Sequence, residues 1–275
     1  MVLICLLIVV YLEYHYKIRE SDRRFLWFGE FSRWVDEKAK VYNWYNEWFD
    51  FVFKVALIPT VLCILFVSGS GFLFWLVKIS LSAYILAHCI GPEVLRKKYD
   101  HYFKSFERKD YEAAYLALGG RFDAEDPCRL VRDVSKDIIV QIYTHYFAVM
   151  VWFIVLGAPG ALFYRLYRER VSQGNNQALE WTSHWIEWVP SRISALMLAF
   201  AGNFHDAKPA LIDAWRHWHK DSLKVIEEVG IRSMVIIETP ESSCAENRDA
   251  IDLAERSLLL LLVLVAAMTI INIVA

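Results

Sequence analysis

IIVQIYTHYFAVMVWFIVLGAPGALFYRLYRER, residues 138–170, is the stretch that decides the fold. It opens with an apolar run from Ile138 to Leu156, about the 20 residues that a helix needs to cross the hydrocarbon core of a bilayer. The run ends at Gly157-Ala158-Pro159-Gly160, where proline removes a backbone donor and glycine loosens the chain. Beyond the break come Arg165, Arg168 and Arg170. The stretch therefore predicts a membrane helix that breaks and ends in a cationic cluster.

The composition favours a membrane protein with charged parts outside the bilayer. Of the 275 residues, 56% are apolar and 15% aromatic, while 23% are charged. A soluble protein of this size would be less apolar, and a pure membrane bundle would be less charged. The formal net charge of −2 gives no electrostatic argument for nucleic acid as a partner. The cysteines form no CxxC pair, so we predict neither a zinc site nor a disulfide framework.

Apolar and charged segments alternate along the chain, which predicts an all-α, polytopic membrane helical bundle. We expect about four or five spans, one of them re-entrant, together with amphipathic cytoplasmic helices. The predicted segments are a first membrane helix (1–16), an amphipathic interfacial segment (17–50), a transmembrane hairpin (51–90), a cytoplasmic helical segment (91–137), the central broken membrane helix (138–170), a second hydrophilic helical segment (171–256) and a C-terminal membrane helix (257–275).

The arginines after the break create a conflict in topology. Cytoplasmic loops collect Lys and Arg, and segments 17–50 and 91–137 are both rich in them. A helix that leaves the cytoplasm near Ile138 should then carry Arg165 to the other side. Either the break turns the chain back, or the apolar segment that begins at Ile193 also crosses the membrane. We favour the first interpretation, in which the shielded, irregular backbone makes the central helix re-entrant.

Arginines placed before and after the central helix are the best site candidates. A guanidinium is a planar fork that fits phosphate or carboxylate, so arginines that converge on one membrane face would form an anion pocket. The alternative is ordinary positive-inside anchoring. The candidates are Arg121, Arg132, Arg165 and Arg192, whereas Arg168 is expected on the other side of its helix and to matter little. Residues expected to shape helices are Gly157, Pro159, Gly160 and Pro190. We predict no catalytic residue and no metal ligand.

Two stretches resemble the AmpE family: Tyr146–Leu166 (YFAVMVWFIVLGAPGALFYRL) and Trp188–Phe204 (WVPSRISALMLAFAGNF). AmpE proteins are inner-membrane proteins tied to regulation of ampC β-lactamase and encoded beside AmpD, an anhydromuropeptide amidase. The resemblance implies a regulatory or sensory protein of the bacterial inner membrane, linked to antibiotic resistance and peptidoglycan recycling. Its expected partners are the lipid bilayer, an anionic small molecule such as a nucleotide or a muropeptide, and, functionally, an AmpD-type amidase.

The same stretches, with Gly120-Arg121 and Arg132, also resemble the CobD/CbiB superfamily of cobalamin-pathway amide ligases. The ligases carry a glutamate-rich motif, and its acidic and amide positions fall here on Lys136, Val140, Gln141 and Thr144. Their aspartate pair falls on Ser183 and His184. ATP-dependent amide formation needs acidic groups to hold magnesium against the phosphates. The resemblance therefore implies a ligase-like scaffold without the ligase site.

Two other functions stay open beside the regulatory one. The first is an adenosylcobinamide-phosphate synthase-like ligase, which would use ATP or another nucleotide. The missing carboxylates argue against it. The second is a small transporter or transporter accessory, because many transporters build a site at a broken helix near mid-membrane. In the regulatory interpretation no cofactor is required.

Overall fold

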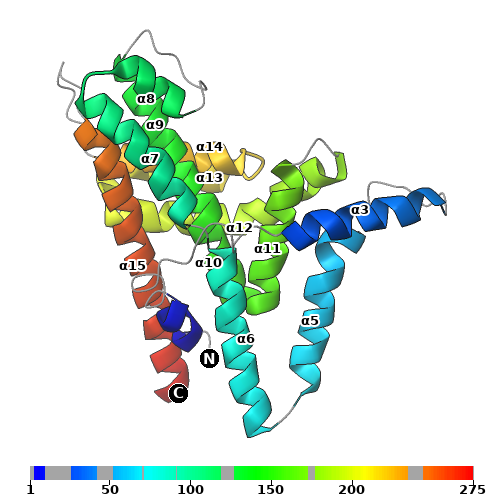
Figure 1. Ribbon diagram of the computed structural model, residues 1–275. Coiled ribbons are helices and arrows are strands. Elements are labelled where there is room, and N and C mark those ends of the chain that lie inside the picture. The colour runs from blue at the N-terminus through cyan, green and yellow to red at the C-terminus, as the bar shows by residue number, and fades with distance from the viewer. Residues whose placement is uncertain are drawn as a thin grey trace. The chain divides into compact units, whose positions relative to one another are not determined.

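The computed structural model describes residues 3–9, 26–41, 52–69, 71–90, 92–118, 127–172, 177–234 and 244–274. Within these ranges every regular element is a helix and no strand occurs, which confirms the all-α expectation (Figure 1). The predicted first membrane helix is described only at 3–9, and the interfacial segment only at 26–41. Arg121 lies outside the described residues.

The chain divides into two compact units, and each is built from two separate pieces of sequence. The first unit comprises 1–91 and 148–188, and the second comprises 92–147 and 189–275. The first contains α3 (Leu26–Val41), the π-helix η1 (Val52–Ala56), α5 (Leu57–Ser68), α6 (Phe72–Cys89), α10 (Ala148–Leu156), α11 (Ala158–Ser172) and the start of α12 (Gln177–Ala201). The second contains α7 (Pro92–Glu107), α8 (Tyr111–Ala117), α9 (Pro127–Ile142), the π-helix η2 (Tyr143–Phe147), the end of α12, α13 (Phe204–Arg216), α14 (Ser222–Ser233) and α15 (Cys244–Val274).

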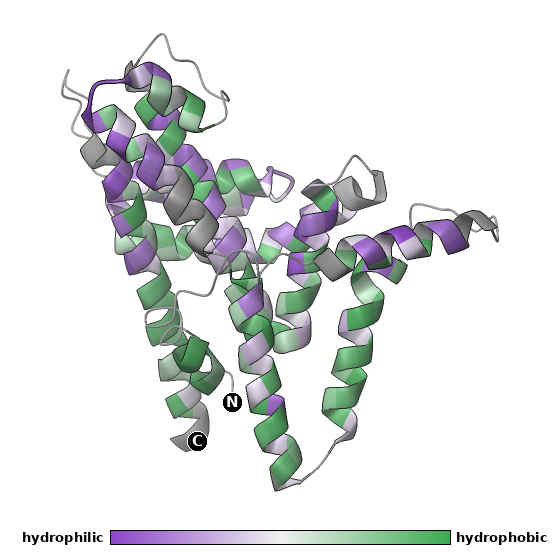
Figure 2. Ribbon diagram, viewed as in Figure 1, coloured by the Kyte–Doolittle hydropathy of each residue, from purple (hydrophilic) through white to green (hydrophobic). Residues whose placement is uncertain are grey.

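Two helical runs in the described chain are long and apolar enough to cross a membrane, namely Leu130–Leu156 and Asn247–Ile271. The first joins α9, η2 and α10 in 27 residues. Val52–Ser68 and Leu73–Cys89 are apolar helices of shorter length. Figure 2 shows hydrophobic residues concentrated along α5, α6 and the C-terminal part of α15. The expected bundle of four or five spans remains a prediction.

In the first unit, α10 and α11 form a helical hairpin at the predicted break. Gly157 separates the two helices with φ 72°, a left-handed conformation that glycine adopts without steric cost. The rings of Trp152 and Phe163 lie 6.1 Å apart, whereas eleven residues of straight helix span about 16 Å. The chain therefore reverses between them, as the re-entrant interpretation requires. The position of this hairpin in a bilayer remains a prediction.

The residues around the turn let α10 and α11 come together. Pro159 occupies the first turn of α11, where its missing N–H leaves no helical bond unmade. Gly160 is buried, and a Cβ there would overlap the backbone oxygen of Trp152 and lie 2.7 Å from the Leu156 Cβ. Only a residue without a side chain fits this approach. Pro190 is likewise buried, inside α12.

In the second unit, α9 packs against α14 and α15, and α7 packs against α8 and α15. Gly230 of α14 lies so close to Ile139 of α9 that a Cβ there would be 2.8 Å from the Ile139 Cγ2. The hydroxyl of Tyr99 on α7 donates to Asp137 Oδ2 of α9 at 2.9 Å. These contacts hold α7 and α14 on α9, the helix that continues into the first candidate span.

Candidate functional site

A buried carboxylate lies between α11 and α12 in the first unit. Glu187 of α12 is only 4% exposed. The hydroxyl of Tyr164 on α11 lies 3.0 and 3.2 Å from its two carboxylate oxygens and donates to them, and Arg168 Nη1 donates at 3.5 Å. A carboxylate buried without such donors would be strongly destabilising. We call Tyr164, Arg168 and Glu187 the Glu187 cluster.

The Glu187 cluster changes the expectation for Arg168. The sequence predicted that Arg168 faces away from the site and matters little, but its guanidinium pairs with the buried Glu187. The same cluster bears on the resemblance to the ligases. Ser183, at a position where the ligases place an aspartate, forms a side-chain hydrogen bond with Tyr167 of α11, and Glu187 follows one helical turn later. An acidic group is therefore present near this place, but Tyr164 and Arg168 already hold it.

Sequence reasoning missed Glu187 because it sits among tryptophans, which are typical of a membrane interface. The sequence carried one signal for Glu187, which is that it stands alone among apolar and aromatic residues. In Trp185-Ile186-Glu187-Trp188 a single carboxylate interrupts an apolar and aromatic turn, and a charge in such surroundings needs a partner. The partner's identity depends on how α11 packs on α12, which one sequence does not show.

Arg165 precedes Arg168 by three residues on α11 and is partly buried. Its Nε is buried and has no hydrogen-bond partner among the described residues. The guanidinium lies near enough to the buried Cys89 thiol of α6 for the two groups to interact electrostatically. A buried donor on a charged group is costly to leave unpaired. Arg165 therefore has donor capacity that an anionic acceptor could use.

Arg192, in the second unit, uses its guanidinium inside the protein. The residue is 1% exposed. Its Nη1 donates to the hydroxyls of Ser191 (2.9 Å) and Ser222 (3.2 Å). Its Nη2 donates to the carbonyls of Ala214 (3.5 Å) and Lys220 (3.3 Å). Burial lowers the pKa of Arg192, while Tyr143 and Asp221 act in the opposite direction. Arg192 thus ties α12 to the connection between α13 and α14.

The remaining candidate arginines do not complete a pocket among the described residues. Arg132 is exposed on α9 in the second unit, Arg165 belongs to the first unit, and Arg121 is outside the described part. The shared anion pocket stays a prediction. Within the described ranges, no group of three or more His, Cys, Asp or Glu side chains is arranged to hold a metal ion.

The helices and the buried charges define the class of this protein. Its described residues form an all-helical protein with two helical runs of membrane-spanning length and a buried carboxylate that pairs with an arginine of a neighbouring helix. The chain belongs to the AmpE family, because the family model described as "Regulatory signalling modulator protein AmpE" matches residues 1–274. Neither the curated proteins nor the solved structures contain a match to this chain. The resemblance to the CobD/CbiB ligases stays a prediction.

Proposed function

We propose that this protein is a multi-pass regulatory protein of the bacterial inner membrane that acts in ampC β-lactamase induction and peptidoglycan recycling. The observation that carries the proposal is the match of the regulatory family over residues 1–274. The two candidate spans and the two shorter apolar helices support a location in the membrane.

The signal that fits the site is an anionic small molecule, a nucleotide or an anhydromuropeptide, bound without a further cofactor. Support comes from the buried Nε of Arg165, which has no hydrogen-bond partner within the described part of the chain. A phosphate or carboxylate oxygen would satisfy this donor, and one charge-assisted hydrogen bond typically contributes about 1.5–3 kcal/mol. Arg192 is not available for this role, because its guanidinium is already bonded within the protein.

Helix α11 offers a physical route from the ligand to the rest of the first unit. It carries Arg165, and it also carries Tyr164 and Arg168, which hold Glu187 of α12. An anion that draws Arg165 toward itself acts on the helix that these bonds tie to α12. A ligand that prefers one arrangement of α11 and α12 would shift the protein between two states, which is what a regulatory coupling requires.

The test combines induction in cells with binding in solution. A strain that lacks the protein is complemented with the wild type, with Arg165→Ala, with Arg165→Lys and with the exposed-lysine control Lys104→Ala, and β-lactamase induction is measured. Purified proteins are titrated with nucleotides and anhydromuropeptides, and with cobinamide to test the ligase alternative. We expect Arg165→Ala to weaken binding about tenfold or more, and Arg165→Lys to recover part of it. Unchanged induction in the strain without the protein would refute the proposed role.

A further inference from the structure

Apolar residues occupy a wider part of the circumference of helix α13 than the rest of the second unit buries. Its inner residues, Ala207, Ala210, Leu211 and Ala214, are buried on the side where α14 packs. Phe204, Ile212 and Trp215 stay 40%, 48% and 52% exposed. With Lys208 they recur every three or four residues and share one helix face. We call Phe204, Lys208, Ile212 and Trp215 the α13 strip.

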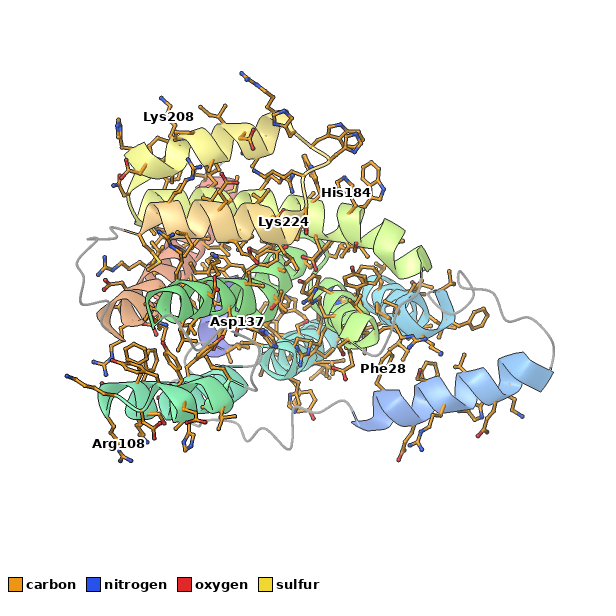
Figure 3. All side chains as sticks on the ribbon, turned by 90° about the horizontal axis from the view of Figure 1, so that it is seen from above. Phe28, Arg108, Asp137, His184, Lys208 and Lys224 are labelled. Atoms are coloured by element: carbon orange, nitrogen blue, oxygen red, sulfur yellow. The ribbon has the colours of Figure 1, made fainter. Side chains whose placement is uncertain are left out.

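Basic side chains lie in and beside the α13 strip, whereas the acidic side chains of the helix lie away from it. Lys208 lies within the strip and points away from α14 (Figure 3). His205 and Arg216 border it, whereas Asp206 and Asp213 lie toward the far edge of the exposed surface. Asp213 is moreover paired with Lys220 at 2.7 Å. The strip thus presents aromatic and aliphatic side chains beside positive charge, and the acidic side chains face elsewhere.

The aromatic surface continues beyond the helix. Phe200, at the end of α12, is 57% exposed, and its ring stacks on that of Phe204 with centroids 5.2 Å apart and planes 7° apart. Large apolar side chains that gather on one face, rather than lying singly, mark a surface that another phase or molecule covers.

The position of α13 along α15 indicates what covers the strip. Gly202 directly precedes α13, and a Cβ on it would lie 2.8 Å from Leu253 Cδ1 of α15. The last charged residues of α15, Glu255 and Arg256, follow at once, and its exposed apolar surface begins at Leu259. Six residues of helix rise about 9 Å, and one headgroup layer is about 5–8 Å thick. When the apolar part of α15 is in the hydrocarbon, the start of α13 therefore lies at the outer edge of the headgroup layer.

The direction of α13 relative to α15 also fits a position at the membrane surface. Within the second unit α13 runs across α15 (Figure 1). A helix that crosses the direction of a membrane span lies along the membrane surface. Aromatic rings and long basic side chains are the residues that favour this layer, because each combines an apolar body with a polar or charged end.

We propose that α13 is an in-plane membrane helix that binds a surface of anionic phospholipid. Phe204, Ile212 and Trp215 reach through the headgroup layer toward the hydrocarbon, and Lys208 and Arg216 contact lipid phosphates. The inference rests on the proposed insertion of α15 in the membrane. It assigns a lipid-contacting role to a segment that by sequence is a hydrophilic region outside the bilayer.

The test uses the full-length protein in nanodiscs of phosphatidylcholine and phosphatidylglycerol. After replacement of the native cysteines, a nitroxide is attached at Ile212→Cys in the strip, at the matched control Asp206→Cys on the same helix, or at Leu264→Cys on α15. Accessibility to oxygen and to a water-soluble nickel complex is measured. We expect oxygen to dominate at 212 and 264, and the nickel complex to dominate at 206. Benzoylphenylalanine at 212 and 206, which needs no cysteine replacement, should crosslink to lipid only at 212.

The outcomes separate the two proposals. Water-like accessibility at 212 with lipid-like accessibility at 264 would overturn the role of α13 alone, and water-like accessibility at 264 would overturn membrane insertion of α15. Spin–spin broadening at 212 between two labelled copies would mean that a second chain covers the strip, and would overturn the lipid contact. Lys208→Glu with Arg216→Glu should lower oxygen accessibility at 212 several-fold in discs with phosphatidylglycerol, while Lys224→Glu on α14 should leave it unchanged.

Discussion

At the scale of single residues, the buried charges differ in what holds them. Glu187 accepts hydrogen bonds from Tyr164 and Arg168. The guanidinium of Arg192 donates hydrogen bonds to two hydroxyls and two carbonyls. Arg165 has a buried Nε for which the described residues supply no hydrogen-bond partner. The sequence could nominate Arg165 and Arg192, because arginines near apolar helices are few and fit anions. It could not show that Arg192 is a structural clamp, since three of its four acceptors, Ala214, Lys220 and Ser222, lie 22 to 30 residues further along the chain.

The Glu187 cluster predicts a coupled effect of two substitutions. Arg168→Ala removes a charged partner of a buried carboxylate and should lower the free energy of unfolding by about 1.5–3 kcal/mol. In a Glu187→Gln background the same change should cost much less, because no buried negative charge remains. Thermal unfolding of the four proteins in detergent measures this double-mutant cycle. Arg132→Ala, at an exposed site, should be nearly neutral. Strictly additive effects of the two substitutions would contradict the pairing.

At the scale of elements, the helices and the break after Leu156 follow from the sequence pattern, and the close packing does not. Glycine next to proline predicted an interruption, and the structure has a reversal there with Gly157 at positive φ. Nothing in one sequence shows that Gly160 would meet Trp152, because this depends on the angle at which α11 returns. For the same reason the exposed strip of α13 became visible only after the buried side of that helix was known.

Gly160→Ala tests the α10–α11 hairpin. A Cβ at this position overlaps the Trp152 oxygen, so the helices must move apart, and such overpacking typically costs about 1–3 kcal/mol of stability. The matched control is Gly29→Ala in α3, where a Cβ would meet nothing within 4 Å. That change should be neutral or stabilise by up to about 1 kcal/mol, because alanine is the better helix former. Melting temperatures in detergent compare the two variants, and equal effects would argue against the close contact.

The ion pairs between α13 and α14 predict a pH window. Hydrogen bonds from Lys220 and then His217 lower the pKa of Asp213, and bonds to Asp213 and Glu228 raise the pKa of Lys220. The stability from Asp213 is present above its unfolded pKa of about 3.9 and is lost as the pH falls through the lowered value. The stability from Lys220 is present below about 10.4 and is lost as the pH rises through the raised value.

Hydrogen exchange of the α14 amides, corrected for the intrinsic pH dependence, should therefore show greatest protection between about pH 4 and pH 10. Asp213→Asn should remove most of the loss of protection on the acid side. Asp252→Asn, an exposed position on α15, is the control and should keep the wild-type profile. A profile of Asp213→Asn that matches the wild type would show that this ion pair does not stabilise α13 against α14.

At the scale of the whole molecule, consecutive segments of sequence are not the units of the fold. Each compact unit combines a piece before residue 147 with a piece after it, and both unit boundaries in the second half of the chain fall inside helical runs. Hydropathy along the chain finds apolar stretches one at a time, so it predicted a central membrane helix at 138–170 and a C-terminal one at 257–275, which overlap the candidate spans Leu130–Leu156 and Asn247–Ile271. It carries no information on which stretches pack together.

The reversal at Gly157 leads to a prediction for the topology of the chain. A helix over Leu130–Leu156 that enters from the cytoplasm returns along α11, whose 15 residues rise about 22 Å. The arginines at 165, 168 and 170 then remain on the cytoplasmic side, in accordance with the positive-inside rule. We expect reporters fused at Asn175 and Glu246 to give cytoplasmic signals, and a reporter at Ala275 to give a periplasmic one because α15 crosses. Periplasmic signals at both Asn175 and Glu246 would mean that the central helix crosses without returning, and that the arginines are tolerated outside.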